Sequence, residues 1–293
     1  MDPELMLQAD AVRLSLAHTF VWVALWCYAL AFVAYVVHLI TPQSKTIRGV
    51  ASTALIVGFI AQCVAIVLRG VTIGRPPFQT LYESLAFFSW TAVLAYLVTE
   101  WRRRVRIPGL FVALVSGAAL AYALLGQNPE VKPLFPALQS KWFVWHVAIA
   151  FGSYAIFTVA FAVELSYLIQ IWFWKLGVTK DYGITRETLS RFHRSVHQLV
   201  LFGFPMLTFG IMSGAAWANE AWGVYWQWDP KETWSLITWF AFALYLHARV
   251  RPTWKNAPST VIMVLAFLCM ITTFVGVSWL AKLFGIPSLH VYG

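Results

Sequence analysis

Eight long hydrophobic stretches follow one another along the 293-residue chain, separated by short polar segments. They cover roughly residues 17–40, 50–68, 81–99, 107–125, 142–174, 196–217, 233–248 and 260–283. A bilayer core about 30 Å thick needs about 20 apolar residues per helix, and each stretch meets this length or nearly so. The pattern predicts an all-α polytopic integral membrane protein with about eight transmembrane helices, which form a single membrane domain over residues 1–293.

The first stretch follows an acidic segment and lacks both a basic leader and a small-residue cleavage site. It is therefore expected to be a retained helix and not a signal peptide. The fifth stretch, residues 142–174, is longer than the bilayer requires, and one of its ends is expected to project into water.

The composition excludes a soluble domain, because 60% of the residues are hydrophobic, 11% are charged and the mean hydropathy is +0.70. A net charge of +9 alone would suit a nucleic-acid partner, but the basic residues form short clusters between the apolar stretches. No nucleic acid is expected. The three cysteines all lie inside apolar stretches without a CxxC pair, which disfavours disulfide, zinc and thiol-redox chemistry.

The clusters also predict the orientation of the chain. Segments 41–49, 100–106, 174–195 and 249–259 contain two, four, five and three basic residues, which makes 14 of the 21 Lys and Arg residues. Because cytoplasmic loops are enriched in Lys and Arg, these four segments are expected on the cytoplasmic side. Both termini and the loop between the sixth and seventh helices are then expected outside (N-out and C-out).

That outward loop carries the most unusual composition of the chain. Five tryptophans, Trp217, Trp222, Trp226, Trp228 and Trp234, fall within 18 residues. Tryptophans are common in the aromatic belts at both membrane surfaces, but a belt distributes its rings over all helices. A planar apolar ligand that stacks on aromatic faces explains the cluster better, so residues 217–234 are interpreted as an outward Trp-rich ligand-binding segment.

Asp229 at the end of this segment has a structural interpretation of its own. It stands directly before Pro230 and three residues before Glu232, at the beginning of an apolar stretch. This arrangement is typical of a helix N-terminus with a capping box. A firmly capped seventh helix would also hold the Trp-rich segment at a fixed height.

Histidines lie at both membrane levels. His146 near the outer start of the fifth stretch and His290 in the outward C-terminal tail share the side of the Trp-rich segment, and imidazole is a common axial ligand of haem iron. His247 and His38 end the seventh and first stretches on the cytoplasmic side. For His18, His193 and His197 an ordinary hydrogen-bonding role at the surface is favoured.

The segment Trp222-Gly-Val-Tyr-Trp226-Gln-Trp228-Asp229-Pro230-Lys-Glu232-Thr-Trp234 resembles the tryptophan-rich "WWD" signature of the haem-handling proteins of cytochrome c maturation. The tyrosine before the third tryptophan and the Asp-Pro-Lys-Glu-Thr that follows are similar to the CcsA/ResC branch of System II. Further matches extend over nearly the whole chain: Leu81-Tyr82-Glu83-Ser84, Gly203-Phe204-Pro205, Ser213-Gly214-Ala215, Tyr245-Leu246-His247 and Leu289-His290.

The resemblance implies that His146 and His290 ligate the iron of haem b axially while the tryptophans and Asp229 form the surrounding site. It also implies that His247 binds haem iron inside the membrane on the cytoplasmic side. The second ligand there would come from a CcsB/ResB-type partner subunit or from His38. His193 stands near a position where the family is expected to have tyrosine, so it receives no role.

The implied activity is that of a cytochrome c haem lyase (synthase) component. It would transport and present haem and attach it covalently to the CxxCH cysteines of apocytochrome c, with no catalytic residue assigned beyond haem positioning. The expected location is the bacterial cytoplasmic membrane, or the thylakoid membrane if the chain is plastid-encoded, with the haem site on the periplasmic or lumenal side. The alternative is a haem exporter without ligation activity. An electron-transfer cytochrome b is disfavoured, because no second helix mirrors His18 and His38.

Overall fold

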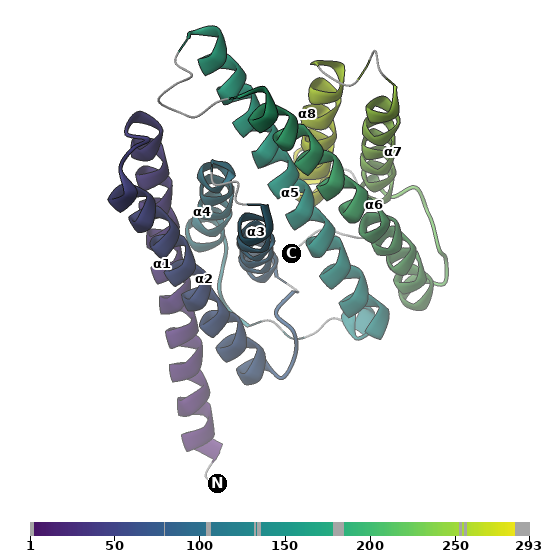
Figure 1. Ribbon diagram of the computed structural model, residues 1–293. Coiled ribbons are helices and arrows are strands. Elements are labelled where there is room, and N and C mark those ends of the chain that lie inside the picture. The colour runs from purple at the N-terminus through teal and green to yellow at the C-terminus, as the bar shows by residue number, and fades with distance from the viewer. Residues whose placement is uncertain are drawn as a thin grey trace. The chain divides into compact units, whose positions relative to one another are not determined.

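The structure is a computed structural model that describes residues 3–78, 80–103, 107–131, 133, 136–177, 185–251, 254 and 257–284. Every regular element among these residues is helical. The chain divides into two compact units, Met1–Pro133 and Leu134–Gly293, and each is described by itself. Figure 1 shows the helices of both units as ribbons.

The first unit contains the four helices α1 (Pro3–Ile40), α2 (Lys45–Ile73), α3 (Leu81–Arg103) and α4 (Pro108–Gly126). The α2 helix begins where the Ser44 side chain accepts a hydrogen bond from the backbone of Ile47, and it ends at Gly74 in the left-handed conformation. A buried chain of hydrogen bonds links three helices: Tyr28 donates to Gln62 at 2.7 Å, and Gln62 donates to the Ala86 carbonyl at 2.7 Å.

The second unit contains η1 (Pro136–Leu138), α5 (Lys141–Lys175), α6 (Arg186–Trp222), α7 (Pro230–Val250), α8 (Ala257–Ile271), the π-helical turn η3 (Thr272–Gly276) and α9 (Val277–Phe284). The long helices α5 and α6 lie side by side in Figure 1 and pack along most of their lengths. The α7 and α8 helices form a second packed pair.

Over residues 140–157 and 203–220, the α5 and α6 helices keep one antiparallel register. The contacting pairs are Phe157 with Gly203, Ala150 with Gly210, His146 with Gly214, Phe143 with Trp217 and Ser140 with Glu220. The two residue numbers add up to the same value in every pair, as expected for two straight antiparallel helices. Three of the α6 partners are glycines, and small residues let membrane helices approach closely. The glycines therefore fix which α5 side chains fit against α6.

Seven of the predicted spans are confirmed as helices long and apolar enough to cross a membrane. The predicted span 233–248 also forms a helix, α7, but this helix is absent from that set among the described residues. Its mean hydropathy is lowered mainly by Lys231, Glu232, His247 and Arg249 near its two ends, although its length of 21 residues is sufficient. The polytopic all-helical fold is thus confirmed, and the number of eight spans stays a prediction.

Several helices extend beyond the apolar stretches that predicted them. The α1 helix begins at Pro3 instead of near residue 17, and α6 begins at Arg186 instead of near residue 196. The added segments contain good helix formers such as Leu, Ala, Glu, Gln and Arg, so the backbone hydrogen bonding continues where the hydrophobic stretch stops. The last predicted span, 260–283, is interrupted by the π-helical turn η3.

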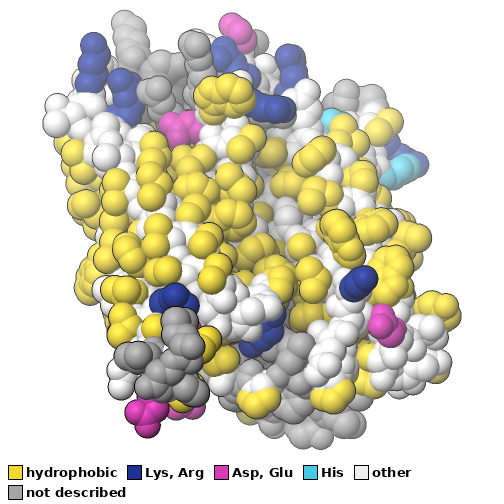
Figure 2. All heavy atoms as spheres, turned by 90° about the horizontal axis from the view of Figure 1, so that it is seen from below, with side chains coloured by type: hydrophobic (Ala, Val, Ile, Leu, Met, Phe, Trp, Pro, Cys, Tyr) yellow, Lys and Arg dark blue, Asp and Glu magenta, His cyan; other side chains and the backbone are white. Residues whose placement is uncertain are grey.

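Large hydrophobic side chains remain exposed on the helices, as in α1, where Trp26, Leu30 and Val33 are all more than half exposed. Figure 2 shows a molecular face on which hydrophobic side chains make up most of the coloured surface. Exposed apolar surface on this scale is unfavourable in water but suits contact with lipid chains. The chain is therefore a multi-pass membrane protein.

Candidate functional site

The end of the α5–α6 pair that carries the Trp-rich segment, which is predicted to face outward and is called the outer end below, positions the imidazole of His146. Its Nδ1 atom lies 2.7 Å from the Gly210 carbonyl oxygen, and a carbonyl can only accept a hydrogen bond. Nδ1 is therefore the ring nitrogen that donates this hydrogen bond, and Nε2 is the other ring nitrogen. A backbone carbonyl that orients a histidine in this way is a common feature of metal-binding sites.

Gly214 provides the space for that ring. A Cβ atom at position 214 would lie 2.7 Å from His146 Nδ1, closer than non-bonded atoms approach. Together, Gly210 supplies the acceptor and Gly214 supplies the room, one helical turn apart on the same face of α6. The sequence Gly210-Ile-Met-Ser-Gly214 thus forms a seat for one α5 histidine.

Trp217 closes this seat on the outer side. Its ring stacks on His146 at a centroid distance of 5.9 Å with an angle of 17° between the planes. Its indole N–H donates to the Ala137 carbonyl of η1 at 2.7 Å, which fixes the orientation of the ring. Trp222, one turn further along α6, packs against Trp217 at 5.0 Å. His146, Trp217 and Trp222 therefore form one continuous aromatic group.

The loop from Gly223 to Asp229 carries the next two tryptophans, Trp226 and Trp228. Gly223 ends α6 in the left-handed conformation, with its N–H bonded to the Asn219 carbonyl at 2.9 Å. Trp226 and Trp228 meet edge to face at 5.8 Å, and Trp228 is 68% exposed. Trp228 also has a φ angle of 58°, which is uncommon for a residue with a side chain.

The capping box predicted at Asp229 is confirmed. Asp229 accepts a hydrogen bond from the Lys231 backbone at 2.8 Å, and the Glu232 side chain accepts from the Asp229 backbone at 3.1 Å. Glu232 also accepts from the Gln227 backbone at 2.8 Å. One carboxylate therefore ties the loop around Trp228 to the first turn of α7, which stabilises its unusual backbone conformation.

The first turn of α7 is in turn attached to the π-helical turn η3. The Thr273 hydroxyl of η3 donates to the Trp234 carbonyl at 3.0 Å and lies 2.8 Å from the Thr238 hydroxyl. Both threonines are buried. A π-helical turn frees backbone and side-chain groups for such contacts and often lies at functional sites. Trp234 therefore belongs to the base of the segment and not to its exposed loop.

The opposite end of the second unit, which is predicted to face the cytoplasm and is called the inner end below, is built differently. His247 lies in the last turn of α7 and is exposed. Arg249, two residues further, donates to the His193 carbonyl at 3.4 Å, and His193 packs against Tyr167 at 3.9 Å between ring centroids. Residues two apart on a helix point to different sides, so Arg249 and His247 do not share a face of α7.

Two of the predicted ligands lie outside the described part of this unit. His290 lies outside the described part of the chain. His38 lies in the last turn of α1, in the first unit. The roles assigned to both histidines stay predictions.

Comparison with known proteins decides the family. Residues 78–284 match the family described as cytochrome C assembly protein. The chain is 32% identical over 282 residues to the cytochrome c biogenesis protein CcsA of Guillardia theta, covering 90% of this chain and 92% of the relative. It is 34% identical over 269 residues to CcsA of Gloeobacter violaceus, covering 74% and 78% of the two chains.

The chain belongs to the cytochrome c assembly protein family. It is a CcsA-type member, as the resemblance of its Trp-rich segment predicted. A third relative, CcsA of Chlamydomonas reinhardtii, is 36% identical over 226 residues, which is 75% of this chain and 62% of the relative.

A solved structure shares the fold. Cytochrome c heme lyase CcmF superposes with a TM-score of 0.61 at 18% identity, covering 94% of this CcsA-type chain. The chain spans about half the length of that structure, 47%. At this identity the likeness shows a common helical fold.

Three residues that hold the candidate site in this CcsA-type chain were not identified from the sequence as site residues. Gly210 and Gly214 orient and accommodate His146, and Glu232 anchors the loop of Trp228. The four-residue spacing of the glycines was a usable signal, since it is typical of close helix packing in membranes. The second contact of Glu232 required a structure, because Gln227 lies outside the capping box.

Proposed function

We propose that this CcsA-type chain binds haem at the outer end of its second unit and presents it for covalent attachment to the CxxCH cysteines of apocytochrome c. The observation that carries the proposal is the seat of His146. Its Nδ1 donates to the Gly210 carbonyl, its ring is stacked on Trp217, and Nε2 is the ring nitrogen proposed to ligate the iron.

The residues present fit haem in three respects. The donor is an imidazole held in a fixed orientation, and the wall beside it is aromatic through Trp217 and Trp222. The exposed pair of Trp226 and Trp228 lies on a loop anchored by Glu232, so further aromatic surface is held in place. His290 is proposed as the second axial ligand, and Asp229 acts by capping α7 below the loop.

In the proposed reaction, haem is the substrate, and each cysteine thiol adds across one vinyl group. A carbon–sulfur bond forms at one vinyl carbon, and the thiol hydrogen is transferred to the other, so no atom is lost. The chain's own contribution is positional: His146 fixes the iron, and the tryptophans fix the plane of the ring. With no acid or base assigned, the rate enhancement comes from orientation.

The inner end is proposed to receive haem from the cytoplasmic side through His247. On α7, His247 continues an exposed face formed by Ile237, Phe240 and Leu244, whereas Tyr245 and Ala248 are buried on the other side. An exposed apolar face that ends in a histidine suits contact with another membrane chain. We therefore propose that a CcsB/ResB-type subunit supplies the second ligand and that His38 does not.

Purification from cells that overproduce the chain with its partner tests the proposal. The expected result is a low-spin haem b spectrum together with conversion of a co-expressed apocytochrome to its covalent form. Haem that moves to the outer compartment without thioether formation would instead support the exporter function.

Compartment reporters fused at Gly126, Trp222 and Gly293 are expected outside, and those at Arg104 and Lys255 inside. An inside signal at Trp222 contradicts the proposed site.

A further inference from the structure

The α1 helix exposes one continuous apolar face that the proposed function does not use. Between residues 21 and 40 its exposed side chains are Val23, Trp26, Leu30, Val33, Val37 and Ile40. They follow one another in steps of three and four residues, so they lie along one face of the helix. Such steps make a heptad repeat, the spacing at which two parallel helices pack along each other. On the opposite face, Ala24, Tyr28 and Ala31 are buried in the first unit.

The same face continues toward the N-terminus of α1. Thr19, Leu16, Val12 and Ala9 follow in the same steps of four and three residues, and all of them are exposed. The Thr19 hydroxyl donates to the Ser15 carbonyl of its own helix at 3.0 Å, so its hydrogen bond does not need another chain. We call the exposed face formed by these positions, from Ala9 to Ile40, the α1 stripe.

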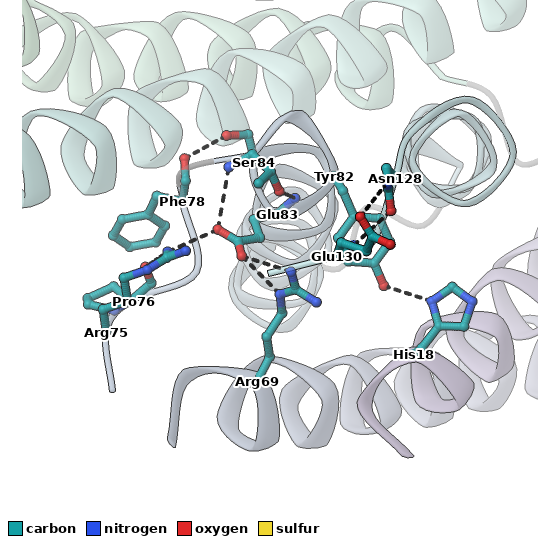
Figure 3. Close-up of polar contacts among 11 residues, drawn as sticks. His18, Arg69, Arg75, Pro76, Phe78, Tyr82, Glu83, Ser84, Asn128 and Glu130 are labelled. Atoms are coloured by element: carbon teal, nitrogen blue, oxygen red, sulfur yellow. Dashed lines mark hydrogen bonds and ion pairs between the residues drawn. The ribbon is translucent and has the colours of Figure 1, made fainter. Parts of the chain in front are cut away.

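A polar cluster marks the membrane surface at this end of the first unit. Figure 3 shows His18 directed toward Tyr82, beside Arg69 and Glu83. The Tyr82 hydroxyl lies 3.3 Å from His18 Nδ1, and the Arg69 guanidinium lies over the Tyr82 ring at 5.1 Å. Arg48 and Arg69 are separated by 21 residues of α2, which at ~1.5 Å per residue matches a bilayer core of about 30 Å. Arg69, and with it His18 of α1, therefore lies at the membrane surface.

The part of α1 that precedes His18 projects beyond this surface. In Figure 1 it extends past the end of α2, and none of its described side chains before Ala17 is buried. The 35 residues from Met6 to Ile40 would span about 50 Å, more than the bilayer core of about 30 Å. Val12 and Leu16 are 59% and 46% exposed where lipid chains do not reach. A single helical segment of this length is marginal in water, so a further protein surface is expected to cover its apolar face.

We propose that the α1 stripe pairs two copies of this chain. Copies inserted in one membrane share their orientation, so two α1 helices would lie parallel and their projecting segments would meet. A second copy therefore offers a helix of the same length, at the same level and with the same heptad spacing. The contact is self-complementary, as a two-fold symmetric interface requires. The pairing is independent of the proposed haem function.

The charges of the projecting segment suit a parallel pair. Asp10 and Arg13 form an ion pair with each other at 3.2 Å, and both lie off the stripe. With Ala9 and Val12 at the centre of the pair, the positions that flank the centre place Arg13 opposite Gln8 of the second copy. Each guanidinium thus meets a neutral amide, and the pairing does not bring two positive charges together.

Cysteine cross-linking of the full chain in its membrane tests the pairing. Val12→Cys places a thiol on the stripe, and Ala11→Cys places one at the neighbouring exposed position off the stripe. Copper-phenanthroline oxidises two facing thiols to a disulfide. Val12→Cys is expected to give a product of twice the 33.1 kDa chain mass, in several-fold higher yield than Ala11→Cys. The wild-type chain, whose Cys27, Cys63 and Cys269 are half-buried, gives the background.

Native mass spectrometry of the chain released from lipid nanodiscs measures the pairing without a cross-link. Leu16→Arg places a charge in the stripe of each copy and is expected to raise the dissociation constant of the dimer about tenfold. Ala11→Arg adds the same charge off the stripe and is the matched control. Equal cross-linking of Val12→Cys and Ala11→Cys, or a Val12→Cys product that contains a different chain, overturns the proposal. A wild-type chain that is entirely monomeric in this measurement also overturns it.

Discussion

The two ends of the second unit place a histidine in opposite ways. At the outer end, His146 is half-buried, bonded through Nδ1 to the Gly210 carbonyl and stacked on Trp217. At the inner end, His247 is exposed in the last turn of α7. Among the residues that the structure describes, none forms a hydrogen bond with its ring. One histidine is fixed by its own chain, and the other is presented on a surface.

The difference indicates how much of each site this chain provides. A ligand that is oriented before binding loses little conformational entropy when it engages the iron, so the outer site suits haem held in one geometry. An exposed ligand on an apolar helix face retains its side-chain freedom until another group covers it. The proposed inner site therefore suits transfer, with the missing surface proposed to come from the partner subunit.

Replacing the outer ligand is expected to have the largest effect. His146→Ala removes the nitrogen proposed to bind the iron and is expected to abolish both outer-site haem and cytochrome c maturation, measured by absorption spectra and by haem staining of the product. Imidazole added to the purified variant is expected to restore a low-spin spectrum, since it fits the space left by the ring. Normal maturation in His146→Ala would show that the outer end is not the ligation site.

The glycine seat offers a test that leaves the histidine itself intact. Gly214→Ala introduces a Cβ atom 2.7 Å from His146 Nδ1, whereas Gly210→Ala introduces one at 3.6 Å from the Ala150 backbone, an ordinary contact. Displacing the ring is expected to lower haem retention about tenfold, at ~1.4 kcal/mol per factor of ten. Gly210→Ala is expected to retain haem nearly as well as the wild type does. Equal haem contents in the two variants would mean that the seat does not orient the ligand.

The inner end is tested with the partner subunit co-expressed. His247→Ala is expected to reduce the haem content of the outer site several-fold, because haem is no longer captured on the cytoplasmic side. His38→Ala is expected to be nearly silent if the partner provides the opposing ligand. Haem content per protein, measured on the purified complex, separates the two variants. A loss in His38→Ala equal to that in His247→Ala would assign the inner site to this chain alone.

Sequence patterns predicted most of the fold because each span is a long apolar stretch whose length the bilayer fixes. They misplaced the helix ends, since α1 and α6 continue through polar residues that favour helix without being apolar. For α7 the pattern predicted the helix correctly, but Lys231, Glu232 and Arg249 near its ends lower its hydropathy. The predicted number of eight spans therefore depends on α7, a helix that carries residues of the candidate site as well as apolar residues.

The candidate site was predictable in its residue types and less so in its geometry. The Trp-rich segment and the Asp229 cap could be predicted, because both are local in sequence. The seat of His146 could not be read in the same way, since Gly210 and Gly214 lie more than 60 residues from it. Only the antiparallel register of α5 and α6 brings them together, and register is a property of packing.

The exposed tryptophans are expected to contribute less than the ligand. Trp228→Ala removes a side chain that is 68% exposed and meets Trp226 at 5.8 Å, so it is expected to weaken haem retention by roughly 1–3 kcal/mol, the value for stacking of a base on an aromatic side chain. Trp228→Phe keeps an aromatic face and is expected to be milder. Titration of haem into the purified variants measures both. Unchanged affinity in Trp228→Ala would exclude the loop from the haem site.

The smallest effect is expected at the anchor of that loop. Glu232→Ala removes the acceptor for the Gln227 and Asp229 backbones, which is expected to lower the stability of the chain by about 1 kcal/mol and to let the Trp228 loop move. Glu187→Ala is the matched control, because Glu187 forms an exposed ion pair with Arg191 in α6, for which about 0.3–0.5 kcal/mol is typical. Thermal midpoints compare the stabilities, and proteolysis at the loop compares its mobility. Faster cleavage near Trp228 in Glu232→Ala alone is the expected result. Equal cleavage in both variants would mean that the carboxylate caps α7 without holding the loop.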